Sequence, residues 1–377
     1  MRYFLIAGEA SGDLHAAGLM HELKKQDPHA EFCFLGGDLM QREGGTLVRH
    51  YRNMAFMGII NVVLNIGKVL ENLKICKENI LKFQPDALIL VDYPSFNLRI
   101  AKYVKKHCPC PVYYYIPPKI WAWKEYRIKD IKKYVDKIFC ILPFEPDFYA
   151  THGYEVAYVG NPCVDAVAGR NEKEQSFDEF TAENRLDRRP IVSLLAGSRK
   201  QEIRNCLPVM LQVAANFPDF QFVVAAAPGI EPAFYTGLLP HWNFALVFDK
   251  TYQLLQQSFA AVVNSGTATL ETALLNIPQV VVYHVPFGRL ATIAKEIILK
   301  IKYVSLVNLI AGKEVVKELT AHLFTPKNLQ NELSRLLFDE LARKNMLAGY
   351  KLIQQKCGSS GVAESAAKGI VKELMGV

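Results

Sequence analysis

Two short segments combine glycine with hydroxyl residues at the spacing of a phosphate-binding turn. Gly197-Ser198-Arg199 and Ser265-Gly266-Thr267 each follow an apolar run and precede a helical pattern. Backbone N–H groups and the dipole of such a helix start favour an anion, and Arg199 adds a fixed positive charge. Glu271 lies one turn into the second helix, where a carboxylate can accept hydrogen bonds from a ribose diol. Since neither a Walker lysine pattern nor kinase motifs accompany them, the two turns predict a nucleotide diphosphate as donor or leaving group.

A carboxylate stands where another apolar run ends. Asp92 follows Ala87–Val91 and precedes Tyr93-Pro94-Ser95-Phe96-Asn97. It could cap the next helix, although a cap is expected nearer Ser95. It could instead act as a general base that takes the proton of a hydroxyl nucleophile. The residues alone leave both interpretations open.

The first strand-end loop, Gly8–Asp13, lacks the GxGxxG spacing, so a dinucleotide fingerprint is not supported. Its glycines allow a tight turn and a close backbone approach. Glu9, Ser11 and Asp13 are candidates for contacts with a ligand, and the alternative is a turn with a helix cap.

An aromatic loop, Pro117–Trp123, contains two prolines and two tryptophans. The prolines stop a helix, and the indole rings present broad faces. Trp121 could therefore form part of the floor of a sugar site, or the loop could simply be packed.

Apolar runs that alternate with helical patterns must position these residues. Such an alternation predicts a parallel sheet covered by helices, with ligands at the carboxyl ends of the strands. Between 169 and 190 the pattern lapses, which predicts a domain boundary, and it then resumes as a second Rossmann-like domain. Predicted strands are 3–7, 32–35, 87–91, 112–116 and 137–141 in the first domain, and 191–195, 221–226, 260–263 and 279–283 in the second.

Composition fits a globular protein of two or three domains. The chain has 377 residues, half of them hydrophobic, which excludes a mostly disordered protein. None of its eight cysteines forms a CxxC pair, so a zinc site is not expected and a reduced, cytosolic chain is the simple interpretation. The N-terminal apolar run is too short for a signal peptide, and no run reaches the length of a membrane-spanning helix.

The segment Phe56–Leu70 predicts a helix that is apolar nearly all round, with one narrow polar stripe. It could be a core helix, or its surface could meet lipid or acyl chains. The candidate membrane or acyl contacts are Phe56, Met57, Ile59, Ile60, Val62, Val63 and Ile66.

Positive charge is concentrated in the first domain. Arg99–Lys137 carries 11 Lys or Arg and three Asp or Glu, while the whole chain has a net charge of +7. Solvated helix faces would explain this excess, and so would a surface that docks on anionic lipid. Nucleic acid is not expected, because no binding module accompanies the charge.

Taken in order, the motifs resemble those of the lipid-A-disaccharide synthase family over about residues 3 to 320. They are Gly8–Asp13, Asp92–Asn97, Ile120–Trp123, Leu142–Glu145, Val159–Pro162, Gly197–Arg199, Ser265–Glu271 and Tyr303–Asn308. The ordered set is far more specific than any one member.

This resemblance implies a GT-B glycosyltransferase with two Rossmann-like domains that face each other across a cleft. The expected limits are 1–168 for an acceptor and membrane-docking domain, 169–345 for a UDP-sugar domain and 346–377 for a helical segment that returns to the first. The implied reaction joins UDP-2,3-diacylglucosamine to 2,3-diacylglucosamine 1-phosphate, giving a β(1→6) tetraacyl disaccharide phosphate and UDP. The implied place is the cytoplasmic face of the inner membrane, as a peripheral protein.

Carried over by position, Asp92 corresponds to the aspartate proposed to activate the acceptor hydroxyl. Arg199, Glu271 and Asn308 fall in donor-side motifs, and Glu9, Ser11 and Asp13 fall in the loop that faces the cleft. The family often has His where this chain has Asn161. The implied mechanism is a single inverting displacement with no cofactor and no metal, because fixed cations and helix ends can stabilise the departing UDP.

Two rival functions predict different substrates. Another inverting glycosyltransferase or a UDP-sugar epimerase of the same fold would use unacylated sugars, and a nucleotide-sugar-binding or membrane-docking protein would show no turnover. The sequence leaves the oligomeric state open, with a homodimer as one possibility.

Overall fold

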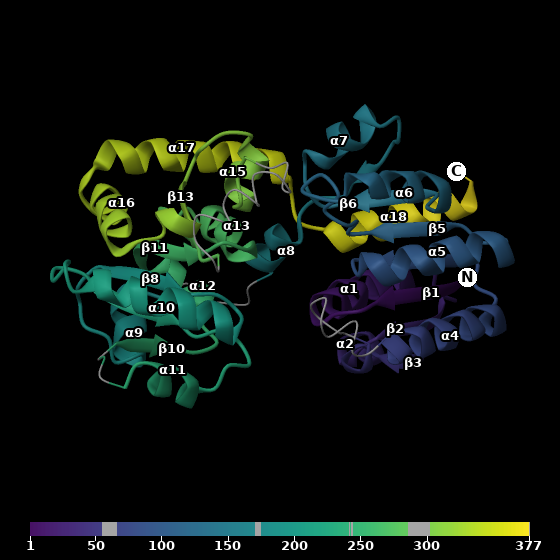
Figure 1. Cartoon of the computed structure of the whole chain (residues 1–377), viewed down its shortest axis with the longest axis horizontal. Coiled ribbons are helices and arrows are strands. Elements are labelled where there is room, and N and C mark those ends of the chain that lie inside the picture. Colours follow the sequence, from purple (N-terminus) through teal and green to yellow (C-terminus); the bar gives the residue numbers. More distant parts are fainter. Residues whose placement is uncertain (55–65, 170–174, 241, 243, 286–301, 377) are drawn as a thin grey trace. The chain divides into compact units, whose positions relative to one another are not determined.

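The chain folds into two α/β units, which a computed structural model describes for residues 1–54, 66–169, 175–240, 242, 244–285 and 302–376 (Figure 1). Unit 1 consists of Met1–Pro162 together with Ser359–Val377, and unit 2 consists of Cys163–Gly358. Each unit contains one parallel sheet covered by helices, which confirms the expected pair of Rossmann-like domains.

Unit 1 is built on a seven-stranded sheet with the order β3-β2-β1-β4-β5-β6-β7. Continuous apolar runs form its central strands because helices cover both faces of the sheet. The strands are β1 (Arg2–Ala7), β2 (Glu31–Gly36), β3 (Thr46–His50), β4 (Ala87–Val91), β5 (Val112–Tyr115), β6 (Lys137–Cys140) and β7 (Ala157–Tyr158).

Alternate residues of each strand of unit 1 enter two different cores. Phe4 and Ile6 of β1 pack in one core, whereas Tyr3 and Leu5 pack in the other. The helices are α1 (Ala10–Gln26), α2 (Asp38–Arg42), α4 (Ile66–Phe83), α5 (Pro94–His107), α6 (Ile128–Tyr134), α7 (Glu145–Thr151) and α18 (Val362–Met375), with short 3₁₀ turns η1 (Tyr51–Asn53) and η2 (Glu125–Arg127).

The C-terminal helix α18 belongs to unit 1, as the GT-B expectation requires. It packs beside α1, and Figure 1 shows it in yellow among the purple and blue elements of that unit. Ala366 and Ile370 are fully buried there. Gly369 lies so close to the Phe139 ring that an added Cβ would stand 2.5 Å from a ring carbon, so a side chain at this position would push the helix off the sheet.

Unit 2 is built on a six-stranded sheet with the order β10-β9-β8-β11-β12-β13. Counted within the unit this is 3-2-1-4-5-6, the order of dinucleotide-binding folds. The strands are β8 (Ile191–Leu195), β9 (Gln221–Ala225), β10 (Ala245–Val247), β11 (Ser258–Asn264), β12 (Gln279–Tyr283) and β13 (Lys317–Thr320).

The helices of unit 2 cover both faces of its sheet. One core joins Val192 and Leu194 to buried residues of α10 and α16, and a second joins Ile191 to Phe180 and Leu254. The helices are α8 (Pro162–Ala168), α9 (Phe177–Glu183), α10 (Lys200–Ala214), α11 (Pro232–Leu238), α12 (Thr251–Gln256), α13 (Thr267–Leu274), α15 (Leu306–Ala311), α16 (Pro326–Phe338) and α17 (Glu340–Cys357), with the 3₁₀ turn η3 (Ala321–Leu323).

The limits of the units differ from the expected domain limits. The chain passes between units after Pro162 and after Gly358, whereas the sequence pattern placed these limits at 168 and 345. A limit at 345 would cut α17, which runs unbroken through that point and is held in unit 2 by the Tyr350 hydroxyl, 3.2 Å from the Ile277 carbonyl. The returning segment is therefore α18 alone.

Most of the apolar segment predicted to contact membrane or acyl chains lies outside the described residues. Phe56, Met57, Ile59, Ile60, Val62 and Val63 all fall there. Ile66 is the first residue of α4. Among the helices that the structure describes, none is both long enough and apolar enough to cross a membrane.

Candidate functional site

The turn after β4 holds Asp92 in an unusual backbone conformation. Asp92 and Tyr93 both have positive φ angles, 46° and 48°, which side-chain-bearing residues rarely adopt. The Asp92 carbonyl accepts hydrogen bonds from the Tyr114 hydroxyl at 2.6 Å and from Asn97 Nδ2 at 2.7 Å. Strain of this kind persists only where the surroundings fix it, and it is concentrated at functional sites.

Asp92 does not cap the following helix. Helix α5 begins at Pro94, its N-cap residue is Tyr93, and none of the side chains that the structure describes caps it. Burial raises the pKa of the Asp92 carboxyl, while the Tyr93 backbone N–H and the Lys119 ammonium group lower it by smaller amounts. A carboxylate with a raised pKa is a stronger base than an exposed aspartate, which is what removal of a hydroxyl proton needs.

The loop after β1 lies beside this turn, because the register pairs Ala7 with Val91. A Cβ on Gly8 would stand 2.3 Å from the Tyr93 ring, so only glycine lets the ring lie there. The Tyr93 hydroxyl donates to the Met54 carbonyl at 3.0 Å. Burial raises the pKa of Tyr93, and the charge of the half-buried Glu9 raises it further.

Of the other first-loop candidates, Ser11 is exposed and Asp13 is a structural anchor. The Asp13 carboxylate is buried and accepts from the backbone N–H groups of Gly37 at 2.8 Å and of Leu39 and Met40 at 3.1 Å. These donors belong to the first turn of α2 and the residue before it. The oxygens of Asp13 thus hold the start of α2 and join the loop after β1 to this helix.

Trp121, predicted as part of a sugar floor, is held by a buried carboxylate. Its Nε1 donates to Glu145 Oε1 at 3.2 Å, and its ring meets Phe144 edge to face at 4.9 Å. Glu145 Oε2 also accepts from the Leu142 N–H at 3.0 Å. Burial raises the pKa of Glu145 to about 7, although these donors and Lys119 lower it.

The exposed aromatic face of this loop is Trp123, which the sequence did not single out. Its side chain is 46% exposed, and it lines a cavity of about 260 Å³ together with Asp92. The remaining lining residues are Pro94, Ile116, Pro117, Pro118, Lys119, Ile120, Lys124 and Arg127. Trp123 thus presents an aromatic side chain at the cavity that Asp92 also lines, whereas Trp121 is held by Glu145.

Asn161 also has a structural contact. It is buried after the sharp turn at Gly160, and its Nδ2 donates to the Ile141 carbonyl at 3.0 Å. It thus ties the loop after β7 to the loop after β6.

In unit 2 the two predicted phosphate-binding turns lie side by side, because the register pairs Leu195 of β8 with Val263 of β11. A Cβ on Gly197 would stand 3.0 Å from Asn264 Nδ2 of the neighbouring turn. Gly197 itself has φ 120°, which favours glycine. The structure therefore brings Gly197, Ser198, Arg199, Ser265, Gly266 and Thr267 together.

The two turns differ in what their amides contact. At the start of α10, Glu202 Oε2 accepts from the backbone N–H groups of Ser198 at 3.0 Å and of Arg199 at 3.3 Å. The Arg199 side chain is 70% exposed, with Nη1 3.6 Å from Glu202 Oε1. An internal carboxylate thus occupies the position predicted for an anion at this turn.

At the start of α13 the amides face outward. Gly266 and Thr267 are exposed, and in the described part of the chain no side chain caps this helix. An added Cβ on Gly266 would meet nothing within 4 Å. Ser265 is fixed by a hydrogen bond, since its Oγ donates to the Val304 carbonyl at 3.1 Å.

Glu271 lies one turn further along α13, where its Oε1 accepts from the Tyr252 hydroxyl at 3.1 Å. Burial raises its pKa and the Tyr252 hydroxyl lowers it. Its position leaves the predicted ribose contact feasible.

Asn308, predicted to contact the nucleotide, has its amide fully engaged inside the protein. Its Nδ2 donates to the Val316 carbonyl at 2.8 Å and to Glu318 Oε1 at 2.9 Å, and its Oδ1 accepts from the N–H groups of Val315 and Val316. Glu318 also accepts from the Val304 N–H. Asn308 therefore positions the loop whose Val304 carbonyl holds Ser265.

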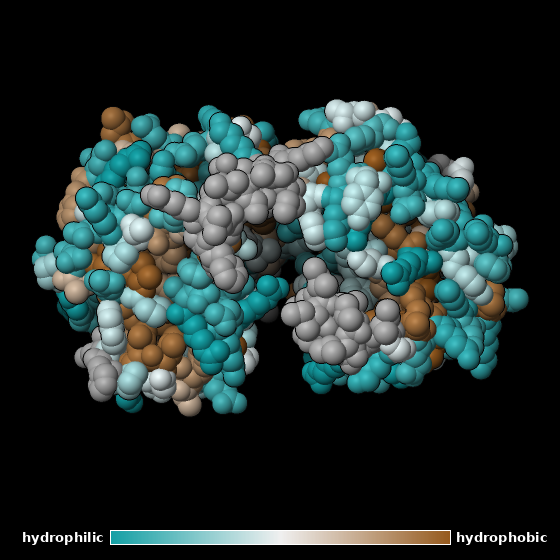
Figure 2. All heavy atoms as spheres, in the orientation of Figure 1, coloured by the Kyte–Doolittle hydropathy of each residue, from teal (hydrophilic) through white to brown (hydrophobic). Residues whose placement is uncertain are grey.

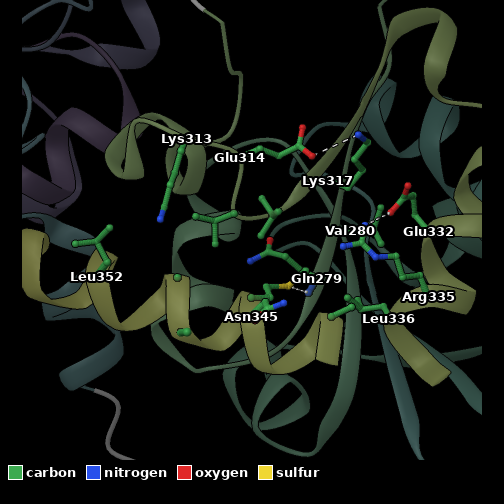
Figure 3. Close-up of a pocket in the computed structure, with 16 residues that line it drawn as sticks. Gln279, Val280, Lys313, Glu314, Lys317, Glu332, Arg335, Leu336, Asn345 and Leu352 are labelled. Carbon is green, nitrogen blue, oxygen red and sulfur yellow. Dashed lines mark hydrogen bonds and ion pairs between the residues drawn. The ribbon is translucent and has the colours of Figure 1, made fainter. Parts of the chain in front are cut away.

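A larger cavity, of about 360 Å³, lies at the opposite edge of the unit 2 sheet. It is lined by Gln279 and Lys317, the first residues of β12 and β13, and by side chains of α16 and α17 (Figure 3). Its charged residues include the ion pairs Glu314–Lys317 and Glu332–Arg335. None of the residues predicted to act in the site lines this cavity. The predicted residues follow the carboxyl ends of the strands, where ligands of such sheets bind.

The family model and the curated relatives agree on one family, and the solved structures show a similar fold. A family model described as lipid-A-disaccharide synthetase matches residues 3–371. The lipid-A-disaccharide synthase of Myxococcus xanthus is 38% identical over 388 residues, covering 99% of this chain and 97% of its own, and that of Geobacter sulfurreducens is 34% identical, covering 100% and 97%. The UDP-GlcNAc 2-epimerase of Neisseria meningitidis bound to UDP-GlcNAc has a similar fold, with a TM-score of 0.66 at 15% identity over the full length of both chains.

Proposed function

Because this chain belongs to the lipid-A-disaccharide synthetase family, we propose that Asp92 is the general base and the turns of unit 2 are the UDP site of its glycosyl transfer. The chain is a glycosyltransferase of lipid A biosynthesis. It condenses a UDP-2,3-diacylglucosamine donor with 2,3-diacylglucosamine 1-phosphate to a β(1→6) disaccharide phosphate and UDP.

The reaction proceeds as one displacement at the anomeric carbon of the donor. The Asp92 carboxylate takes the proton of the acceptor 6-hydroxyl as that oxygen forms a bond to the carbon. The bond between the carbon and the β-phosphate oxygen breaks, and UDP leaves with the electron pair. Inversion follows because attack and departure occur on opposite faces.

Unit 2 stabilises the leaving diphosphate. The outward amides of Gly266 and Thr267 lie at the positive end of α13, and the exposed guanidinium of Arg199 provides paired donors. Glu202 must release the amides of Ser198 and Arg199 before a phosphate binds there, so that turn exchanges an internal anion for the ligand. Glu271 accepts from the ribose hydroxyls.

The observation that carries the proposal is the placement of Asp92. A strained, half-buried carboxylate lines a cavity beside an exposed tryptophan face, at the carboxyl end of a strand where this fold binds ligands. None of its contacts gives it a role as a helix cap.

One assay separates the proposal from its rivals. The protein is incubated with acylated or unacylated UDP-glucosamine and with diacylglucosamine 1-phosphate, and UDP release and disaccharide are measured. We expect both products only with the acylated pair. An epimerase would form an isomerised UDP-sugar without an acceptor, and a binding protein would release no UDP.

We further propose that unit 1 docks on the anionic inner-membrane surface as a peripheral contact. Helices α5 and α6 carry much of the basic segment, and hydrophilic side chains cover much of that face of unit 1 (Figure 2). Lys106 and Lys129 are exposed there. Replacing both by Gln is expected to weaken binding to phosphatidylglycerol vesicles about 30-fold at low salt, since each cation contributes about 1 kcal/mol.

The matched control replaces Lys327 and Lys351, two exposed lysines of unit 2, by Gln. Equal loss of vesicle binding in the two double variants would contradict a docking face on unit 1. Sedimentation with vesicles measures both.

A further inference from the structure

Three cationic side chains line the cavity beside Asp92, and in the part of the chain that the structure describes none of them forms an ion pair. Lys119, Lys124 and Arg127 all line it, and within the described ranges no Asp or Glu lies within ion-pair distance of any of them. Other cations of the same basic segment are paired, as Lys105 is with Asp136 at 2.5 Å and Lys137 with Glu373 at 3.3 Å. Unpaired like charges repel one another, so this arrangement favours an anion as ligand.

Two of the cations are held in place. Arg127 Nη2 donates to Ser95 Oγ at 2.9 Å, which fixes the guanidinium against the first turn of α5 and leaves its other N–H groups for a ligand. Lys124 Nζ lies 3.9 Å from the centroid of the Trp123 ring, a cation–π contact. The cavity thus joins an aromatic face to fixed positive charge.

The charge of the lining matches one phosphate group. Asp92 and the three cations together give the cavity a net charge of +2, which a phosphate monoester neutralises near pH 7. The volume of about 260 Å³ is small for a ligand site, so it fits a single sugar ring or head group and not a nucleic-acid strand.

We propose that Lys119, Lys124 and Arg127 bind the phosphate of a phosphorylated acceptor sugar while Asp92 faces its hydroxyl. This inference rests on the proposed function, because it assigns the acceptor phosphate to the site in which Asp92 acts. Charge on the acceptor then determines specificity: a sugar without the phosphate leaves the three cations without a partner.

The test compares two acceptors that differ only in the anomeric substituent, which is a phosphate in one and an uncharged methoxy group in the other. These are diacylglucosamine 1-phosphate and the methyl glycoside of the same diacylglucosamine, each in detergent micelles with the acylated donor. The Lys124→Met and Arg127→Met variants are each expected to lower the ratio of kcat/KM for the charged over the uncharged acceptor by about 10- to 100-fold, the effect of one hydrogen bond to a charged group. Arg127→Lys should restore part of the ratio.

The control is Lys327→Met, which removes the same charge from an exposed position of α16 that does not line the cavity. It should leave the ratio within twofold of the original protein. An unchanged ratio in the Lys124 and Arg127 variants, with disaccharide still formed, overturns the phosphate site and leaves the proposed function intact.

Calorimetric titration with diacylglucosamine 1-phosphate gives a readout that does not need turnover. Binding that weakens in the Lys124 and Arg127 variants but not in Lys327→Met supports the phosphate site even if no disaccharide forms, in which case the proposed function fails alone. Equal binding by all variants overturns the site.

Discussion

The two units share one sheet topology but differ in what they present at the carboxyl ends of their strands. In unit 1 the main chain of the turn after β4 is held by Tyr114 and Asn97, and the Asp92 carboxylate faces a cavity. In unit 2 the side chain of Ser265 is held by Val304, and the amides of Gly266 and Thr267 face outward. We therefore expect the same fold to provide a base in one unit and an anion-binding turn in the other, because a carboxylate lines the cavity of unit 1 and an exposed helix start follows β11 in unit 2.

The largest effect is expected from Asp92→Asn, which removes the base but keeps the shape of the side chain. Turnover should fall about 10²- to 10⁴-fold, the usual contribution of a general base. UDP release from the acylated donor and acceptor measures it. Asp130→Asn, at an exposed position of α6, is the control, and a rate near that of the original protein in Asp92→Asn would remove Asp92 from the mechanism.

The free energy of unfolding of unit 1 should also depend on pH, because of Glu145. Its pKa of about 7 in the folded chain lies above the ordinary value of 4.5, so between these values the folded chain keeps a proton that the unfolded chain has released. The stabilisation is complete below about pH 4.5 and is lost as the pH rises through 7, in total about 3 kcal/mol. Glu145→Gln should abolish this dependence.

Urea unfolding of the original protein and of Glu145→Gln at pH 5 and pH 8 gives the free energy of unfolding of each. The contribution of Glu145 is the difference between their changes with pH. Asp147→Asn, exposed on the same helix, is the control and should unfold with the original pH dependence. An identical pH dependence in Glu145→Gln would contradict the assignment of this term to the carboxyl that holds Trp121.

In unit 2, Arg199→Met should weaken UDP binding about 10- to 100-fold, because a charge-assisted hydrogen bond to phosphate is lost. Calorimetric titration with UDP measures the change. The Arg188→Met variant removes an arginine that is 85% exposed elsewhere in the unit, and its affinity should not change. Equal affinities in the two variants would show that Arg199 does not reach the diphosphate.

The smallest effect is expected from Glu202→Gln, which tests the difference between the two turns of unit 2. Its carboxylate competes with a phosphate for the amides of Ser198 and Arg199. Loss of the charge should tighten UDP binding about two- to fivefold, the range of an exposed ion pair. Weaker UDP binding would mean that Glu202 supports the ligand and does not compete with it.

The central strands could be predicted from sequence because they are continuous apolar runs. Four strands were missed, and each lies at a sheet edge or is very short: β3, β7, β10 and β13. Thr46–His50 and Lys317–Thr320 contain charged residues because an edge strand is partly solvated, so no apolar run marks them.

The positions of the site loops were predictable, since parallel strands bring their carboxyl ends to one edge. The hydrogen-bond partners of individual side chains were not predictable. Asp13 contacts residues 24 to 27 positions away, and Trp121 contacts a carboxylate 24 positions away. Such partners depend on tertiary packing, so sequence spacing alone could not separate these anchors from residues that face a ligand. The buried Glu145 follows the same rule, and its only local signal is the Leu142–Glu145 motif.

The division between a base in unit 1 and a nucleotide site in unit 2 is tested most directly by titrating UDP into Asp92→Asn. The variant should bind UDP with a Kd within twofold of that of the original protein while its turnover is nearly abolished. A loss of UDP affinity that parallels the loss of turnover would contradict the account, because Asp92 would then act through the nucleotide site.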